Sequence, residues 1–470
     1  MKNTIQIPHK TTSVTAIMRT LLFFLVILAY SCDDFVEVDP PTTQLSSPLV
    51  FEEYSTANAA LVAIYAEIRD NGLLTGNPNG MSYKLGEYTD ELQFFGAGGQ
   101  TDASFYNNIV LANNTEVKNW WNATYNQIYA TNALLEGLEN ATALTQIQKE
   151  PLQGEALFIR ALLHFHLTNL YGDLPYVTTT NYGTNSTISK TATSAIYAKV
   201  EADLLRAESL LNAAYSTEGR VRPNKATVQA LLARVYLYSE KWADASTKAS
   251  EVLNNTALYG GTQNLNEVFL KDSFTTIWQL SPTNEGENTL EAQTNIFLQG
   301  PPPVSGLSDS FVNGFEEGDQ RRIKWIKEVT DGTTVWYHAF KYKTFENTGA
   351  SVEYSILFRT AEQYLIRAEA RAKQGDLMGA AEDLNRIRNE AGLQNTTATT
   401  ATELRAAIIK ERRAEMFSEG HRFFDLKRTQ LLNEVLAPTK PGWNTNDQLF
   451  PIPETELLLN PNLNPQNPGY

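Results

Sequence analysis

Cysteine is almost absent from this chain of 470 residues, in which Cys32 is the only copy. A single thiol excludes an internal disulfide and a cysteine-based metal cluster. Histidine is also scarce, and the five copies show no zinc-binding spacing, because His164 and His166 stand two apart and would point to different faces of a helix. The sequence also lacks a Gly-x-Ser-x-Gly elbow, a Walker loop and a dinucleotide fingerprint. We therefore expect neither a metal site nor a cofactor.

Positive charge is in deficit, because 38 Lys and Arg oppose 53 Asp and Glu and give a formal net charge of −15. This balance disfavours nucleic acid and anionic lipid headgroups as partners. Hydrophobic residues make up 42% of the chain and charged residues 19%, which predicts a globular body rather than a disordered one.

The apolar run near the N-terminus is short. As a helix, Leu21–Ala29 would span only ~14 Å, too little for a hydrocarbon core of ~30 Å. It follows a basic leader and precedes small residues, which predicts a signal peptide over residues 1–31. Leu28-Ala-Tyr-Ser-Cys32 resembles a bacterial lipobox, in which the cysteine is acylated; the alternative is an ordinary cleaved signal followed by a chance cysteine. The Pro/Thr/Ser-rich segment 32–50 is typical of a flexible tether.

Helical periodicity dominates much of the remaining sequence. It is found in the segments 51–70, 119–138, 154–170 and 194–211. Two further segments, 224–253 and 361–388, place alanines and large residues at the offsets of a tetratricopeptide helix pair. Pairing 51–70 with 119–138 and 154–170 with 194–211 completes about four pairs. The sequence therefore predicts a mostly α-helical fold of tetratricopeptide-like repeats with little β structure.

Two long segments interrupt this pattern, and we refer to residues 71–118 and 260–358 as the first and second excursions. Gly, Pro, Asn and Thr replace the helical period there, although residues 334–342 alternate as in a short strand. Long loops inside an ordered domain are usually functional. We therefore expect irregular excursions that carry the binding site.

The most specific motifs lie in the last third of the chain. In order they are Asp383–Arg388, Ala391–Leu393, Glu411–Glu415, Glu419–Arg428 and Phe450–Pro453. Tyr171-Gly-Asp-Leu-Pro175 and the acidic-then-Arg segment 314–322 precede them. Together these motifs resemble the SusD/RagB family of nutrient-binding lipoproteins over nearly the whole mature chain. The resemblance implies a single domain over 51–470, with an N-terminal part 51–259 and a C-terminal part 260–470.

The resemblance also implies a function. It indicates a protein that is anchored to the outer membrane through Cys32, faces the cell exterior and is not an enzyme. It implies binding of an oligosaccharide and its delivery to a SusC-like TonB-dependent transporter. Three alternatives stay open: a peptide cargo as in some RagB-like members, a surface glycoside hydrolase using Asp90 and Glu91, and a tetratricopeptide scaffold for a protein partner.

The charged C-terminal motifs are interpreted as structural. Glu411, Arg412, Arg413, Glu415 and Glu419 stand at spacings that allow opposite charges to pair along one helix. If these side chains are partly buried with Arg422, Asp425 and Arg428 nearby, we expect them to form a network in which opposite charges satisfy one another. The proline-rich tail is expected to wrap the body as an extended strap, because its prolines disfavour helix.

Ligand binding is assigned to aromatic side chains in the excursions. Sugar rings stack their C–H faces on aromatic rings and bond their hydroxyls to amides and carboxylates. The ligand-binding candidates are Tyr83, Asp90, Phe94, Trp325 and Trp336. Trp120, Trp121 and Trp242 fall on helical stripes and are expected in the core.

Overall fold

The computed structural model describes residues 48–96, 101–262 and 264–470. The predicted signal peptide, Cys32 and the tether up to residue 47 lie outside the described residues. Within the described part of the chain, no helix is long and apolar enough to cross a membrane. Residues 48–470 form one compact unit.

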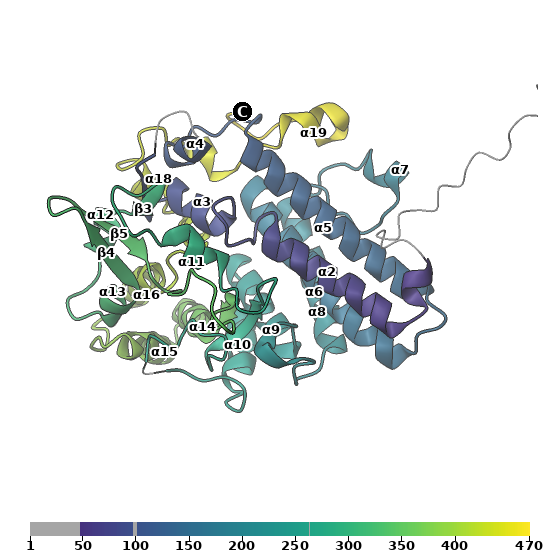
Figure 1. The fold of residues 1–470 in the computed structure, drawn as a ribbon, viewed down its shortest axis with the longest axis horizontal. Coiled ribbons are helices and arrows are strands. Elements are labelled where there is room, and N and C mark those ends of the chain that lie inside the picture. The colour runs from purple at the N-terminus through teal and green to yellow at the C-terminus, as the bar shows by residue number, and fades with distance from the viewer. Residues whose placement is uncertain (1–47, 97–100, 263) are drawn as a thin grey trace, which may run out of the picture. The chain divides into compact units, whose positions relative to one another are not determined.

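Long helices make up the scaffold (Figure 1). They are α2 (Tyr54–Asp70), α5 (Thr115–Asn140), α6 (Gln146–Tyr171), α8 (Thr193–Leu210), α9 (Lys225–Tyr238), α10 (Trp242–Leu253), α14 (Thr360–Gln374), α15 (Leu377–Glu390) and α16 (Ala401–Glu415). The predicted pairs are confirmed, since α2 packs on α5, α6 on α8, α9 on α10 and α14 on α15. Contacts of α5 with α6, of α8 with α9 and of α10 with α14 join the four pairs into one scaffold.

Small residues explain the close helix packing. Ala233, Ala245, Ala249, Ala368 and Ala380 are all fully buried between paired helices. Large apolar side chains such as Leu384 and Ile387 fill the space beside them. Trp120 and Trp121 lie in the core as predicted. The prediction for Trp242 is wrong: it opens α10, is half-exposed, and packs against the Lys373 ammonium, 4.8 Å from the ring centre.

Local signals set the helix ends. The side chain of Asn114 accepts hydrogen bonds from the amides of Glu116 and Val117 at the start of α5. Thr400 and Glu403 form a capping box at the start of α16. Helix α6 begins at Gln146 rather than near Gly154, because Thr145 and Gln148 form another such box.

Short helices occupy the excursions, the connection between α6 and α8, and the C-terminal region. They are α3 (Met81–Tyr88), α4 (Thr101–Tyr106), α7 (Tyr182–Asn185), α11 (Leu290–Asn295), α12 (Asp309–Val312), α13 (Gln320–Lys324), α17 (Arg422–Arg428), α18 (Leu432–Leu436) and α19 (Glu454–Leu459). Single 3-10 turns are η1 (Pro48–Phe51), η2 (Glu218–Arg220), η3 (Thr445–Gln448) and η4 (Pro461–Leu463). These short elements, together with the strands described below, interrupt both excursions, but residues 340–354 carry neither helix nor strand.

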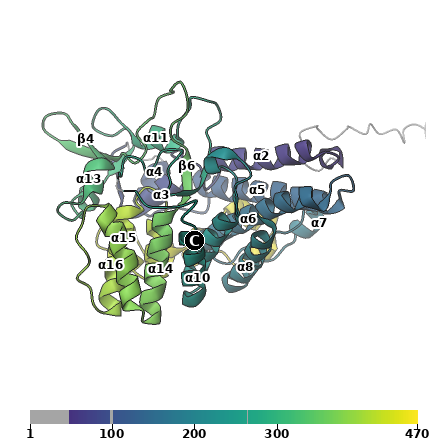
Figure 2. The same cartoon turned by 90° about the horizontal axis from the view of Figure 1, so that it is seen from below.

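The described strands form two small sheets. They are β1 (Leu92–Phe94), β2 (Thr276–Leu280), β3 (Ser305–Leu307), β4 (Ile326–Thr330), β5 (Val335–Ala339) and β6 (Ser355–Arg359). The larger sheet has the order β1-β3-β5-β4, and β2 pairs with β6 in the other. Strand β5 confirms the short strand predicted within 334–342. In Figure 2, β4, α11 and α13 lie on the upper side of the molecule, and α8, α10, α14 and α16 extend towards the opposite, lower side.

The C-terminal tail is fastened to the first half of the chain. The Phe450 amide donates to the Leu170 carbonyl at 2.9 Å, and the Asn467 side chain donates to the carbonyls of Tyr171 and Phe450 at 2.8 and 2.7 Å. The tail is not wholly extended as predicted, because α19 begins directly after Pro453. Pro453 is the N-cap of α19, and a proline there removes no intrahelical hydrogen bond, so it permits this start.

Candidate ligand-binding surface

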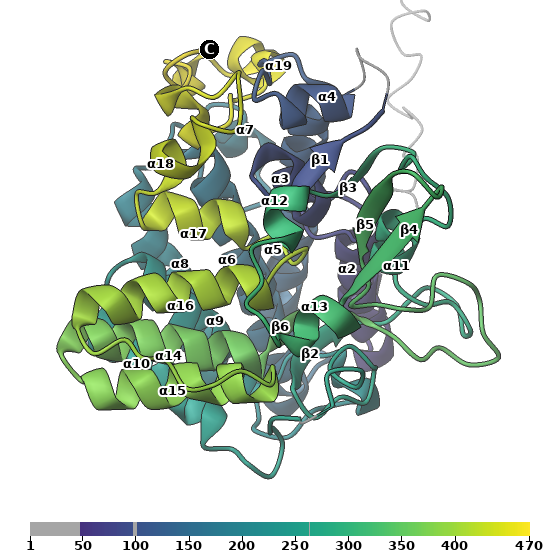
Figure 3. The same ribbon diagram turned by 90° about the vertical axis from the view of Figure 1, so that its left-hand side faces the viewer.

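The two excursions meet in the four-stranded sheet. Strand β1 of the first excursion pairs antiparallel with β3 of the second, in the register Leu92↔Leu307 and Phe94↔Ser305. Strand β3 continues to β5 through Leu307↔Tyr337. Figure 3 shows this sheet beside α3 and α12, away from the layer of α14, α15 and α16. Segments more than two hundred residues apart thereby form one surface.

Phe94 and Tyr106 form a half-buried aromatic pair at this junction. Their ring centres are 6.3 Å apart, with the rings tilted by 34°. The Lys440 ammonium lies 3.7 Å from the centre of the Tyr106 ring and donates to the Glu87 carbonyl at 2.6 Å. Lys440 is buried, and this burial lowers its pKa to about 7. The pair is therefore held in place by the C-terminal region, and its exposed parts present aromatic surface. We call Phe94 and Tyr106 the aromatic pair.

A buried charge cluster fixes the elements around the aromatic pair. Lys84 of α3 forms ion pairs with Glu87, at 3.3 Å, and with Asp102 of α4. The Ser305 hydroxyl donates to the Glu87 carboxylate at 2.7 Å, which connects β3 to α3. Burial raises the pKa of Glu87 to about 7. These contacts join α3, α4 and β3 around the strand that carries Phe94.

Two of the predicted ligand contacts lie in the core. Trp325 has no exposed surface: its indole N–H donates to the Leu265 carbonyl at 2.9 Å, and its ring meets Phe269 edge-on at 5.4 Å. Tyr83 is 5% exposed and packs in the same cluster. This corrects the assignment of these two rings to an exposed binding surface, because the residues that cover them come from distant segments.

Trp336 is nearly buried in β5, with 9% of its surface exposed. Gly300 lies directly against its indole, so that a Cβ at this position would come within 2.0 Å of the ring. Only an edge of Trp336 reaches the surface. Its part in ligand binding stays a prediction, as does that of Phe94.

Asp90 is engaged by two guanidinium groups. Arg422 donates to both of its carboxylate oxygens, at 2.8 and 2.9 Å, and Arg413 lies 2.8 Å from one of them. Burial opposes ionisation of this carboxyl, but the two arginines hold its pKa below the ordinary value. Burial and the charge of Asp90 raise the pKa of the neighbouring Glu91 to about 7. Asp90 therefore fastens α3 to the C-terminal motif and has little capacity left for another partner.

The charged C-terminal motif pairs across elements. Within the described part of the chain, no ion pair joins two of the residues 411, 412, 413, 415 and 419, so the expected pairing along one helix is wrong. The expected network with Asp425 and Arg428 is confirmed, because Asp425 pairs with both Arg412 and Arg428. Instead the pairs are Arg321–Glu411 (2.7 Å), Arg359–Glu419 (2.8 Å), Arg412–Asp425 (2.7 Å), Lys341–Glu419 (2.6 Å) and Arg428–Glu369 (2.7 Å). These side chains are largely buried, and the motif connects the second excursion to the helices.

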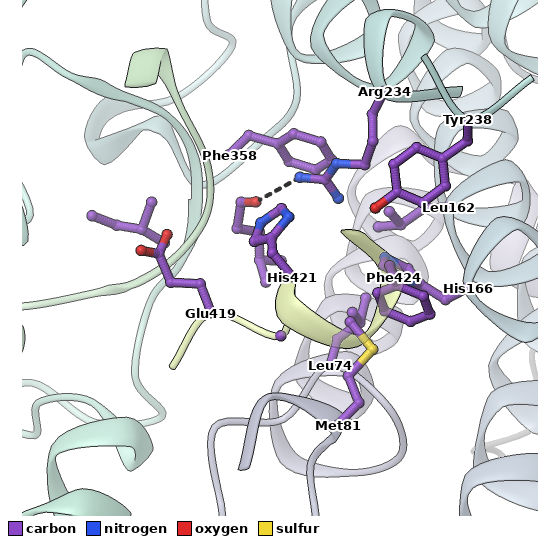
Figure 4. Close-up of a pocket in the computed structure, with 13 residues that line it drawn as sticks. Leu74, Met81, Leu162, His166, Arg234, Tyr238, Phe358, Glu419, His421 and Phe424 are labelled. Carbon is purple, nitrogen blue, oxygen red and sulfur yellow. Dashed lines mark hydrogen bonds between the residues drawn. The ribbon is translucent and has the colours of Figure 1, made fainter. Parts of the chain in front are cut away.

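An internal cavity of about 40 Å³ lies between α6, α9, α17 and the strand β6. Figure 4 shows His166, Arg234, Tyr238 and His421 around it. Burial lowers the pKa of His166 to about 3 and that of His421 well below its ordinary value, so both imidazoles are neutral at pH 7. Such a cavity has room for about one to three waters, far too little for a sugar ring.

The contacts of the aromatic pair involve residues that the sequence does not identify as partners. Lys440 lies in a Pro/Gly-containing segment of the tail, and nothing in its local sequence indicates contact with Tyr106. Tyr106 itself is one of many excursion aromatics. To place the two excursions side by side from the sequence, one would have to predict that β1 pairs with β3.

The fold and this surface define a class: a tetratricopeptide-like helical protein whose two inserted segments build one face. Residues 18–237 match a family model described as "Starch-binding associating with outer membrane", and residues 310–470 match the model of the SusD family. The chain belongs to the SusD/RagB family, which confirms the resemblance seen in its motifs.

Relatives and solved structures agree with this assignment. SusD-like protein P2 of Formosa agariphila is 28% identical over 424 residues, which cover 77% of this chain and 83% of that protein. A SusD superfamily protein from Bacteroides vulgatus has a TM-score of 0.76 at 22% identity, over 89% of this chain and 100% of that chain. A laminarin-binding SusD-like protein has a TM-score of 0.74 at 24% identity, over 88% and 99%. These likenesses confirm the helical fold.

Proposed function

We propose that this protein binds an oligosaccharide at the cell surface and delivers it to a SusC-like TonB-dependent transporter in the outer membrane. The observation that carries the proposal is the junction of the two excursions, where the aromatic pair of Phe94 and Tyr106 is held half-buried beside the β1–β3 sheet. Aromatic surface of this kind suits the C–H face of a sugar ring. Membership of the family, and the laminarin ligand named for one structural relative, support a glycan as cargo.

The proposal is for binding without turnover. Hydrolysis of a glycosidic bond needs one carboxylic acid that donates a proton and a second carboxylate that acts as base or nucleophile. Asp90 is committed to Arg413 and Arg422, and Glu91 is 2% exposed. Neither side chain of this pair is therefore free to act on a bound glycan.

Isothermal titration calorimetry of the purified protein tests the cargo. The panel consists of laminarin, starch, other soluble glycans and a set of oligopeptides. We expect saturable binding of at least one glycan, with no release of reducing ends on prolonged incubation. Binding of oligopeptides alone would assign the protein to peptide uptake, and no binding by either class would contradict the proposal.

Co-purification tests the transporter. We propose that the helical scaffold docks on the transporter and leaves the excursions to hold the ligand. Affinity purification of the protein from detergent-solubilised outer membranes is expected to retain one large TonB-dependent receptor in stoichiometric amount. Recovery of the protein without such a receptor, under conditions that preserve a known pair, would contradict this part.

A further inference from the structure

The two segments that meet at the aromatic pair are poor in charged residues. Residues 92–115 and 292–308 contain one between them, Asp102, although charged residues make up 19% of the whole chain. The first segment contributes β1, α4 and both rings of the aromatic pair, and the second contributes β3. The antiparallel pairing of β1 with β3 joins the two segments into one face of low charge.

Amide side chains stand next to both rings in the sequence. Gln93 precedes Phe94 in β1, and Asn107 directly follows Tyr106 at the end of α4. Both amides are half-buried, and the Asn107 side chain donates to the Ala103 carbonyl at 2.8 Å, which orients it. A side-chain amide both donates and accepts hydrogen bonds, as a sugar hydroxyl does. The polar groups of this face therefore match hydroxyls.

The lysines beneath the aromatic pair are bound to internal partners. Lys84 pairs with Glu87 at 3.3 Å and with Asp102. Lys440 stacks on the Tyr106 ring and donates to the Glu87 carbonyl at 2.6 Å. Both lysines are buried, and a buried cation that left its partner for a ligand would leave that partner unsatisfied. Neither ammonium is therefore available to an anionic ligand.

The arginines around the junction are engaged as well. Arg413 and Arg422 both bind Asp90, which lies two positions before β1. Strand β4 forms the opposite edge of the sheet from β1, and there Arg322 pairs with Glu328 at 2.7 Å. Each of these guanidinium groups already has a carboxylate partner.

Asp102 places a negative charge beside the aromatic pair. It stands four positions before Tyr106 on α4, so its carboxylate and the ring lie on the same side of the helix. Its side chain is 18% exposed, whereas that of its partner Lys84 is 2% exposed. The formal net charge of −15 adds a negative potential over longer distances. A carboxylate or sulfate that approached the rings would lose water without gaining a cation, and it would be repelled.

We propose that the glycan recognised at the aromatic pair is uncharged: an oligosaccharide whose contacting residues carry hydroxyl groups and neither carboxylate nor sulfate. The inference rests on the proposed function, because it names the class of glycan that the same surface accepts. The C–H faces of the sugar stack on Phe94 and Tyr106, and its hydroxyls bond to amides such as that of Asn107. Burying a hydroxyl against an amide costs far less than burying a carboxylate without a cation. The surface therefore selects against uronic acids and sulfated sugars.

Calorimetry with two groups of probes tests the inference. The neutral group is laminarin, soluble starch and galactomannan, and the anionic group is alginate, polygalacturonate and carrageenan. We expect saturable binding within the neutral group only. An anionic probe that binds as tightly as any neutral one would overturn this inference and leave the proposed function standing. No binding in either group would overturn the proposed oligosaccharide cargo and this inference together.

A matched set of ligands separates charge from shape. The neutral probe that binds is compared with its derivative in which the C6 hydroxymethyl groups are oxidised to carboxylates, and with the methyl ester of that derivative. We expect the carboxylated form to bind at least about tenfold more weakly and the ester to recover most of the affinity. Raising NaCl from about 0.05 to about 0.5 M should strengthen the residual binding of the carboxylated form, because salt screens repulsion. An ester as weak as the carboxylate, or carboxylate binding that weakens with salt, would overturn the inference.

Asp102→Asn tests the local charge. We expect the ratio of the affinities for the neutral and the carboxylated ligand to fall severalfold in this variant. Glu52→Gln, which removes an exposed carboxylate elsewhere and changes the net charge equally, should leave the ratio as in the wild-type protein. Thermal melts establish that each variant is folded, and if Asp102→Asn is not, the matched ligands decide on the wild-type protein alone. An unchanged ratio in folded Asp102→Asn would contradict the exclusion of anionic glycans by charge at this face.

Discussion

At the scale of single residues, the tertiary neighbours of a side chain decide its role, and the sequence beside it does not. Trp325 stands among charged and polar neighbours in sequence, yet Phe269 and Tyr342 come from other segments and enclose it in one cluster. Trp242 lies on a helical stripe and is half-exposed, because it is the first residue of α10 and the buried residues of that helix begin at Ala245. Composition in a local window could therefore not separate ligand contacts from core.

Replacing Asp90 tests whether it is structural. Asp90→Asn removes the negative charge that neutralises Arg413 and Arg422, both of which are largely buried. Leaving buried charges without their partner costs about 3–5 kcal/mol. We expect a clearly lower unfolding free energy by denaturant titration and no change in any release of reducing ends. Unchanged stability together with a loss of such release would instead favour the hydrolase alternative.

Glu91 gives a stability effect that depends on pH. Its folded-state pKa of about 7 lies above the ordinary value near 4.3, so its contribution to stability is fully present below pH ~4 and is lost as the pH rises through 7. Glu91→Gln removes that loss. The difference in unfolding free energy between Glu91→Gln and the wild-type protein is therefore expected to favour the variant by about 2 kcal/mol more at pH 8 than at pH 5. A gain that is larger at pH 5 would contradict the raised pKa.

At the scale of elements, periodicity predicted the helices well and the excursions poorly. The stripes and alanine offsets located α2, α5, α6, α8 and the pairs α9–α10 and α14–α15, because helix pairing depends on residues that are close in sequence. The pairing of β1 with β3 joins residues more than two hundred positions apart, and strands of three residues are too short to show a period. The ligand surface was for that reason the least predictable part.

The position of the C-terminal tail also depends on contacts with residues that are distant in sequence. Asn467→Ala removes the donor that serves the carbonyls of Tyr171 and Phe450, both in buried surroundings. An unsatisfied buried carbonyl costs about 1–3 kcal/mol. We expect the melting temperature to fall by several degrees, whereas Asn464→Ala, in an exposed part of the same tail, leaves it nearly unchanged. Equal effects of the two variants would show that the tail is not fastened by Asn467.

At the scale of the whole molecule, a rigid helical body and a loop-built face are joined by buried ion pairs. Arg321 and Lys341 of the second excursion, and Arg359 directly after it, bind carboxylates of the motif 411–419, and Asp90 of the first excursion binds Arg413 and Arg422. The motifs that identify the family therefore hold both excursions to the scaffold. We propose that ligand choice depends on the side chains that the excursions expose.

The membrane anchor is a further prediction at this scale. Cys32 follows the predicted signal peptide, and acylation there would hold the mature protein at the outer membrane. Cys32→Ser is expected to move the protein from the membrane fraction to the soluble fraction, and mass spectrometry of the wild-type N-terminal peptide should find acyl chains. A wild-type peptide without acyl groups would contradict the anchor.

The most direct test of the central claim is the glycan affinity of the double variant Phe94→Ala, Tyr106→Ala, measured by calorimetry with whichever glycan the panel identifies. Trp242→Ala is the matched control, since it removes a half-exposed aromatic ring from the helical scaffold. Loss of stacking is worth about 0.5–1.5 kcal/mol for each ring beyond its buried area. We therefore expect the double variant to bind at least about tenfold more weakly while the control binds as wild type does. Wild-type affinity in a folded double variant would contradict the account.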